Sequence, residues 1–76
     1  MTAEEIKNTI GQIFQKTNRQ APLEDKPLSA ELDSLALMMF IYEVEQAFSV
    51  KFGLADLDEK LTLGRLIELI ASKKQD

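Results

Sequence analysis

Cysteine and histidine are both absent from this 76-residue chain, and each absence excludes a class of function. Without cysteine there is no disulfide, no thiolate zinc site and no thiol nucleophile. Without histidine there is no serine–histidine triad and no histidine metal site. The chain also lacks an apolar run long enough to span a bilayer, and its start does not read as a signal peptide. We therefore expect a cytoplasmic protein with little catalytic equipment of its own.

The chain is short and acidic, which limits both its architecture and its partners. Its length suits a single domain over residues 1–76. Thirteen acidic residues against nine basic ones give a net charge of −4. That charge opposes nucleic-acid phosphate and anionic lipid, so we expect no nucleic-acid binding and no stable membrane insertion. The acids Asp56 and Asp58 lack the twelve-residue calcium-loop pattern, so no metal site is expected.

Apolar periodicity predicts an all-α fold. Thr2 and Glu5 have the spacing of a capping box, and a helix of about residues 3–17 follows. A second helix is expected over about 34–49 and a third, capped by Thr62, over about 63–73. The first helix has the apolar stripe Ile6, Ile10, Ile13 and Phe14, and the last has Leu63, Leu66, Ile67 and Ile70.

Two connections separate the predicted helices. Residues 18–33 contain helix breakers and read as a long loop that Leu23, Leu28 and Leu32 anchor to the core. Residues 54–60 indicate a short helix or turn. These elements together predict a small antiparallel bundle of three or four helices.

The second predicted helix has two apolar faces. At 100° per residue, one face carries Leu37, Phe40, Ile41, Val44 and Phe48. The opposite face carries Leu35, Met38, Met39 and Tyr42, with Glu45 beside them. Only one face is needed to close a core. The other is either covered by the loop and a neighbouring helix or is a docking surface.

The start of this helix is a candidate modification site. Asp33, Ser34 and Leu35 stand where the long loop enters the helix. A helix N-terminus has unpaired N–H groups with partial positive charge, which favours a covalently attached phosphate. The alternative is that Ser34 only caps the helix, as serines often do. The residues alone leave both readings open.

The segment LDSLALMMFIYEVEQAF, residues 32–48, resembles the prosthetic-group attachment region of acyl carrier proteins. That family has an Asp-Ser-Leu triplet, then a mostly apolar helix that ends in an acidic stretch and a phenylalanine. The matching residues are Asp33, Ser34, Leu35, Glu43, Glu45 and Phe48. The resemblance covers essentially the whole chain and implies a bundle of the acyl-carrier type.

The resemblance also implies a function. Ser34 would bear a 4′-phosphopantetheine arm, and Asp33 would help to hold the magnesium ion used by the phosphopantetheinyl transferase. The chain would be a monomer that presents acyl thioesters to acyl-transferring and condensing enzymes of fatty-acid, polyketide or related lipid biosynthesis. Partner enzymes would read the residues Asp33, Leu35, Met38, Met39, Tyr42 and Glu45.

Three positions depart from the common family pattern. Glu31 stands where many members have glycine, Met39 stands where many have an acid, and Tyr42 adds an aromatic ring to the same face. We infer a dedicated set of partners whose docking is less purely electrostatic than usual.

Family members can shelter the acyl chain between their helices. The residues expected to line such a space here, beside the adaptable Met38, are Phe40, Ile41, Leu57, Leu61, Leu66 and Ile70. An ordinary solid core fits these residues equally well.

Two other functions stay open. One is an aminoacyl or peptidyl carrier, and the other is an unmodified helical module that binds partners through the Leu35–Met39–Tyr42 face. Modification by a phosphopantetheinyl transferase distinguishes a carrier from such a module.

Overall fold

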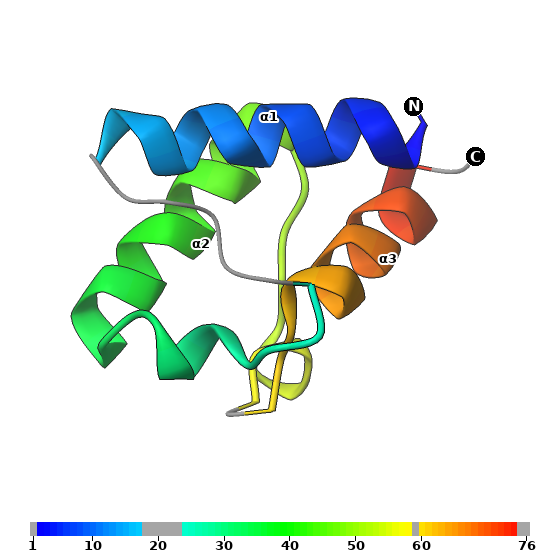
Figure 1. Cartoon of the computed structure of the whole chain (residues 1–76). Coiled ribbons are helices and arrows are strands. Elements are labelled where there is room, and N and C mark those ends of the chain that lie inside the picture. The colour runs from blue at the N-terminus through cyan, green and yellow to red at the C-terminus, as the bar shows by residue number, and fades with distance from the viewer. Residues whose placement is uncertain (1, 18–23, 59, 75–76) are drawn as a thin grey trace.

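The fold is a small all-α bundle, as the periodicity predicts. The computed structural model describes residues 2–17, 24–58 and 60–74 (Figure 1). Helix α1 packs against both other helices, and in the view of Figure 1 it runs from right to left, whereas α2 and α3 rise obliquely from left to right. The elements in chain order are α1 (Ala3–Lys16), the 3₁₀ turn η1 (Leu28–Ala30), α2 (Ser34–Phe48), the 3₁₀ turn η2 (Leu54–Asp56) and α3 (Leu63–Lys74).

Helix α1 begins with the predicted capping box. The Thr2 backbone N–H donates to Glu5 Oε1 at 3.0 Å, and the Glu5 N–H donates to Thr2 Oγ1 at 3.2 Å. The bond from the Thr2 backbone N–H to the carboxylate favours its ionised form and is the larger cause that lowers the pKa of Glu5, and hydrogen bonding with the Thr2 side chain adds to it. The four predicted apolar residues are all buried. The helix ends at Lys16, and the Thr17 N–H donates back to Phe14 O at 3.1 Å.

The first connection has more structure than the sequence predicts. It contains η1, whose buried Leu28 donates its backbone N–H to Leu61 O at 2.8 Å. Pro27, with φ of −62°, precedes this turn and forms a bridge with Thr62. The predicted anchors Leu28 and Leu32 are buried, whereas Leu23 lies outside the described residues.

The connection between α2 and α3 is fastened to both helices. Helix α2 ends at Phe48 because Ser49 has a left-handed φ of 56°. The Phe52 N–H then donates to the Glu45 carboxylate at 2.9 Å. Farther along, Lys73 Nζ lies 3.8 Å from Asp56 Oδ2 and 5.6 Å from the centre of the Phe52 ring. The predicted short helix or turn after residue 54 is η2, while Glu59 lies outside the described residues.

Glu24 ties the first connection to α1 and α3. Its side chain forms an ion pair with Lys7, and this hydrogen bond raises the pKa of Lys7. Its carbonyl accepts the Gly64 N–H at 3.0 Å. A Cβ at position 64 would lie 3.2 Å from that same oxygen, so glycine permits the close approach.

The core joins all three helices. Thr62 caps α3 as predicted, since its Oγ1 accepts the Arg65 N–H at 3.1 Å. In the described part of the chain no polar or charged residue is buried, and none of its helices is both long and apolar enough to cross a bilayer. The buried residues are Ile6, Ile10, Ile13, Phe14, Leu28, Leu32, Phe40, Ile41, Val44, Phe48, Val50, Leu61, Leu63, Leu66, Ile67 and Ile70.

Candidate functional site

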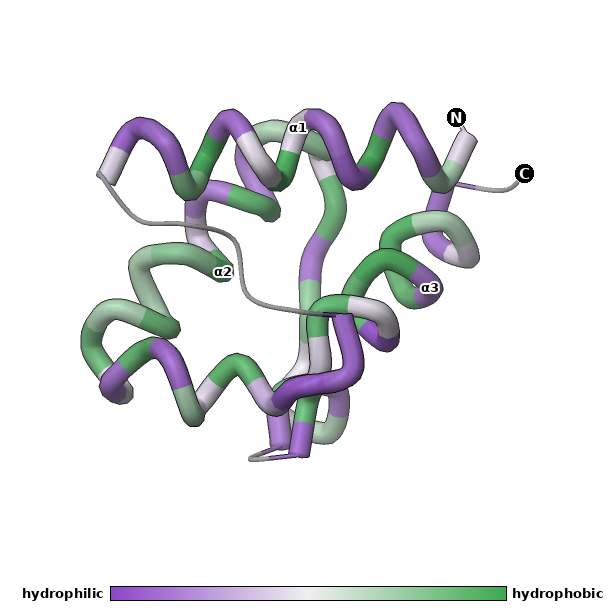
Figure 2. Tube along the Cα trace, in the orientation of Figure 1, coloured by the Kyte–Doolittle hydropathy of each residue, from purple (hydrophilic) through white to green (hydrophobic). Residues whose placement is uncertain are grey.

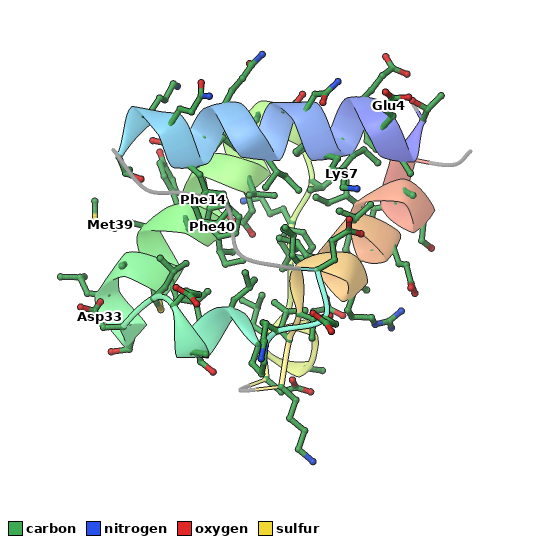
Figure 3. All side chains as sticks on the ribbon, viewed as in Figure 1. Glu4, Lys7, Phe14, Asp33, Met39 and Phe40 are labelled. Carbon is green, nitrogen blue, oxygen red and sulfur yellow. The ribbon has the colours of Figure 1, made fainter. Side chains whose placement is uncertain are left out.

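At the start of α2, the residue that caps the helix is not the residue that carries the candidate hydroxyl. Asp33, in an extended conformation, is the N-cap, and its Oδ1 accepts the Ala36 N–H at 2.8 Å. Ser34 is the first residue inside the helix and is exposed. The reading of Ser34 as the helix cap is therefore wrong, because Asp33 does that work. Figure 3 shows Asp33 at the exposed beginning of α2.

The turn η1 and the buried residue before the cap hold the N-terminus of α2 in place. The turn η1 packs against α2. Leu32 is buried directly before the cap, and its N–H donates to Leu28 O at 2.9 Å. The Leu37 N–H donates to Asp33 O at 2.8 Å, which closes the first turn of α2. Ser34 is therefore presented to solvent from a structured base rather than from a loose loop.

Helix α2 exposes four large apolar side chains on its outer face. We use the name outer face for this set, whose exposed fractions are Leu35 71%, Met38 70%, Met39 61% and Tyr42 60%. The opposite face is buried through Phe40, Ile41, Val44 and Phe48. The predicted division into two faces is confirmed, and the described part of the chain does not cover the outer one.

The two acids of α2 lie in different settings. Glu43 is exposed, and its Oε2 lies 3.9 Å from Lys16 Nζ of α1. Glu45 is half-buried and accepts the backbone N–H of Phe52. Sequence reasoning placed Glu45 with the partner-recognition residues and missed this bond. Nothing in the sequence signals it, because the bond depends on how the chain turns after Ser49.

A groove lies between the C-terminal half of α1 and the first three turns of α2. Its volume is about 580 Å³. Phe14 and Phe40 stack at its base, with ring centres 4.6 Å apart and an interplanar angle of 30°. Figure 3 shows these two rings between the helices and Met39 pointing outward from α2. The lining residues are Ile13, Phe14, Thr17, Leu32, Ala36, Met38, Met39, Phe40, Tyr42 and Glu43.

This groove differs from the space that sequence reasoning expected. Of the residues predicted to line an acyl-chain space, Met38 and Phe40 border the groove. Ile41, Leu61, Leu66 and Ile70 are buried in the core, and Leu57 is half-buried against it. The contribution of α1 was missed because the sequence does not show which side of α2 that helix packs on.

The acidic side chains near η2 accept hydrogen bonds from backbone N–H groups of the same segment. Asp56 Oδ2 accepts the Gly53 N–H at 3.1 Å, and Asp58 Oδ1 accepts the Lys60 N–H at 2.9 Å. Among the described residues no group of three or more metal-binding side chains comes together.

A comparison with known families gives a match over most of the chain. The family model described as phosphopantetheine attachment site matches residues 4–70, which include all of α2 and its cap. No curated protein matches the chain. No solved structure matches it either.

Proposed function

This chain belongs to the family of phosphopantetheine attachment domains, and from that premise we propose that Ser34 carries the arm. Domains of this family bear a covalent 4′-phosphopantetheine and are non-catalytic carriers. The arm supplies a thiol that holds the cargo as a thioester. This chain, which has no cysteine, supplies the attachment point and the surfaces that partner enzymes read.

The single observation that carries the assignment is the geometry at the start of α2. Ser34 is exposed, and its helix is capped by Asp33, so modification of its hydroxyl removes no cap. The first turn of α2 contains no acidic residue. A phosphate on Ser34 would therefore supply negative charge where the helix dipole favours it. These features fit a phosphodiester at this position.

The attachment reaction assigns roles to the neighbouring residues. The Ser34 oxygen forms the new bond to the pantetheine phosphorus of coenzyme A, and the bond to the adenosine bisphosphate leaving group breaks. The proton of Ser34 leaves with a base of the transferase. Asp33 adjoins this hydroxyl, and we assign it to the transferase-bound magnesium ion. Leu35, largely exposed one residue later, is the apolar contact beside the arm.

We assign docking of the other partner enzymes to the outer face of α2. Exposed apolar patches of this kind mark interaction sites in soluble proteins. Glu45 lies beside this face, with one carboxylate oxygen already bound to Phe52. The partners that follow from the thioester chemistry are acyl-transferring and condensing enzymes.

The cargo we propose is an acyl intermediate of fatty-acid, polyketide or related lipid biosynthesis, carried by a cytoplasmic monomer. An aminoacyl or peptidyl carrier would use the same serine and is the second candidate. The two differ in what the chain must accommodate beyond the thioester: an alkyl chain in one case and an ammonium group or peptide in the other.

Intact-mass measurement tests the attachment site. The protein is incubated with coenzyme A, magnesium and a broad-specificity phosphopantetheinyl transferase. We expect a mass gain of one phosphopantetheine on the wild type and none on Ser34→Ala. Ser72→Ala, which removes an exposed hydroxyl on α3, is the matched control and should be modified like the wild type.

The folding of the variants must be checked in the same experiment. Ser34→Ala removes no cap and places a good helix former in the first turn, so its stability should stay within about 0.5 kcal/mol of the wild type. A modified Ser34→Ala protein would refute the assignment of the site. An unmodified wild type, beside a known carrier that is modified in the same tube, would count against the carrier function with this transferase and favour the outer face as the functional site.

A further inference from the structure

The outer face of α2 is uncharged along the whole helix. Its four large apolar side chains fall within an arc of about 100° around the helix axis, at about 100° per residue. Gln46, which is exposed and uncharged, falls in the same arc one turn after Tyr42. The sequence has no charged residue between Asp33 and Glu43. A partner that lies along this face therefore meets mainly carbon and sulfur atoms rather than carboxylates.

The two acids of α2 flank the outer face, and each is engaged within the molecule. Glu43 Oε2 lies 3.9 Å from Lys16 Nζ of α1, so a positive charge of the chain itself offsets this carboxylate. Glu45 Oε2 accepts the Phe52 N–H at 2.9 Å. Turning Glu45 toward a partner would take the acceptor away from that part-buried N–H, which is unfavourable. The structure thus leaves α2 without a carboxylate held ready for a basic partner.

The other acidic residues of the helical segments lie away from the outer face. Glu31 and Asp33 precede α2, and Asp33 Oδ1 caps the helix. Figure 3 shows Glu4, in the first turn of α1, on the opposite side of the molecule from Asp33. The net charge of −4 can therefore attract a basic protein to the molecule as a whole, but it forms no acidic row along α2.

The outer face lies within reach of any enzyme that acts on Ser34. Met38 stands one helical turn after Ser34, on the same side of α2. Tyr42 stands eight residues after Ser34, a rise of about 12 Å along the helix. An interface of ordinary size buries about 800 Å² on each partner, which corresponds to a disc of about 16 Å radius. An enzyme that receives the group on Ser34 can therefore cover the outer face in the same contact.

We propose that the outer face docks against an apolar surface of the partner enzyme rather than against a basic one. This inference rests on the proposed attachment at Ser34 and on the proposed docking role of this face. Lysine or arginine side chains placed against it would lose hydration and gain no carboxylate in return. An apolar surface loses nothing comparable, and the adaptable Met38 and Met39 side chains can follow its shape. Position 39 thereby determines which class of partner the carrier fits.

The phosphopantetheinyl transferase is a partner whose docking can be measured directly. The full-length protein receives coenzyme A, magnesium and one of two transferases, one with an apolar carrier-docking surface and one with a basic surface. A reference carrier that both enzymes load equally well is assayed beside it. The quantity compared is kcat/KM for loading, and each product is checked by intact mass.

The variants separate apolar contact from charge. Tyr42→Ala removes an apolar side chain, and Met39→Glu introduces a carboxylate on the outer face. Glu43→Gln and Glu45→Gln remove the two charges of α2, and the amide oxygen at position 45 can still accept the same backbone hydrogen bond. Asn8→Glu is the matched control for added charge, because Asn8 is exposed on α1, on the side away from the buried stripe of that helix.

With the apolar-docking transferase, Tyr42→Ala and Met39→Glu should each lower kcat/KM about tenfold. Glu43→Gln and Glu45→Gln should change it by less than about twofold. With the basic-docking transferase, Met39→Glu should instead raise kcat/KM about threefold at low salt, and high salt should abolish the gain. Opposite effects of one substitution on two enzymes cannot arise from loss of folding. Relative to the reference carrier, the wild type should be the better substrate of the apolar-docking enzyme.

Two results would overturn the proposal. One is slow loading of Glu43→Gln and Glu45→Gln beside an unchanged Tyr42→Ala, because carboxylates would then direct docking. The other is a wild type that, relative to the reference carrier, is the better substrate of the basic-docking enzyme. Either result leaves the attachment at Ser34 intact. If neither enzyme loads the folded wild type while both load the reference carrier, the proposed function fails, and this inference fails with it.

Discussion

Helices α1 and α2 are nearly equal in length, with 14 and 15 residues, but they distribute their apolar side chains differently. Figure 2 shows hydrophilic and hydrophobic segments alternating along α1, whereas α2 is hydrophobic over most of its length. The large apolar side chains of α1 are all buried. Those of α2 are divided between the core and solvent. Packing among the described residues accounts for the pattern of α1 but for only one face of α2, and this difference is why we propose the outer face as the docking surface.

The largest expected effect is the difference in stability between a variant of a buried residue of α1 and a variant of an exposed residue of α2. Ile10 of α1 is 1% exposed, and Ile10→Ala should lower the free energy of unfolding by about 2–5 kcal/mol. Met39 of α2 is 61% exposed, and Met39→Ala should change it by less than about 0.5 kcal/mol. Urea denaturation followed by circular dichroism measures both values.

The contrast between the two variants is the informative quantity. A domain of this size has a total stability of roughly 4–11 kcal/mol, so Ile10→Ala should remove a large share of it. A large destabilisation by Met39→Ala would show that the outer face supports the fold. Such a result would contradict the proposal that the outer face is a docking surface.

The second expected effect is on partner binding, and it should appear on α2 alone. Under the proposed function, Met39→Glu and Tyr42→Ala should each weaken docking of the loaded protein to a condensing enzyme by about tenfold or more, because large side chains dominate such interfaces. Asn8→Ala changes an exposed residue of α1 and is the control. Titration calorimetry with the condensing enzyme that elongates the loaded carrier fastest measures the three affinities. Equal affinities for all three variants would refute the assignment of the outer face.

The same two helices show how far the sequence determines the fold. The spacing of Ile6, Ile10 and Ile13 predicts α1 to within one residue of its observed end, because helical periodicity and the capping box are local signals. The exposed and buried faces of α2 follow equally well from 100° per residue. The turn η1 was not predicted. Its own hydrogen bonds are local, but its place against the core is fixed by a bond from the Leu28 N–H to Leu61 O, which is distant in the chain.

In the candidate site, too, features that depend on neighbouring residues could be predicted, whereas features that depend on the packing of distant segments could not. The Asp33–Ser34–Leu35 triplet is local, so its place at the start of α2 followed from the sequence. The sequence did not show whether Asp33 or Ser34 caps the helix, because both residue types are good caps. The groove required the packing of α1 on α2, and a single sequence contains no signal for the pairing of Phe14 with Phe40.

The smallest expected effect compares the electrostatics of the two helix starts. The first turn of α1 contains Glu4 and Glu5, whereas that of α2 contains no acidic residue. Glu5→Gln preserves the capping-box pattern, which accepts glutamine, and removes only the charge. Above the ordinary pKa of Glu5, the wild type should therefore be slightly more stable than the variant.

The pH dependence of that difference has a definite sign. The folded-state pKa of Glu5 is lowered from 4.5, so the folded protein binds this proton less readily than the unfolded chain. The stabilisation from the charge is thus fully present above pH 4.5 and is lost as the pH falls through the lowered folded-state value. Urea midpoints of the wild type and Glu5→Gln, measured between pH 7 and pH 3, should converge in acid. A difference that persists or grows below pH 4 would mean that the hydrogen bonds of the capping box, rather than its charge, distinguish the two proteins.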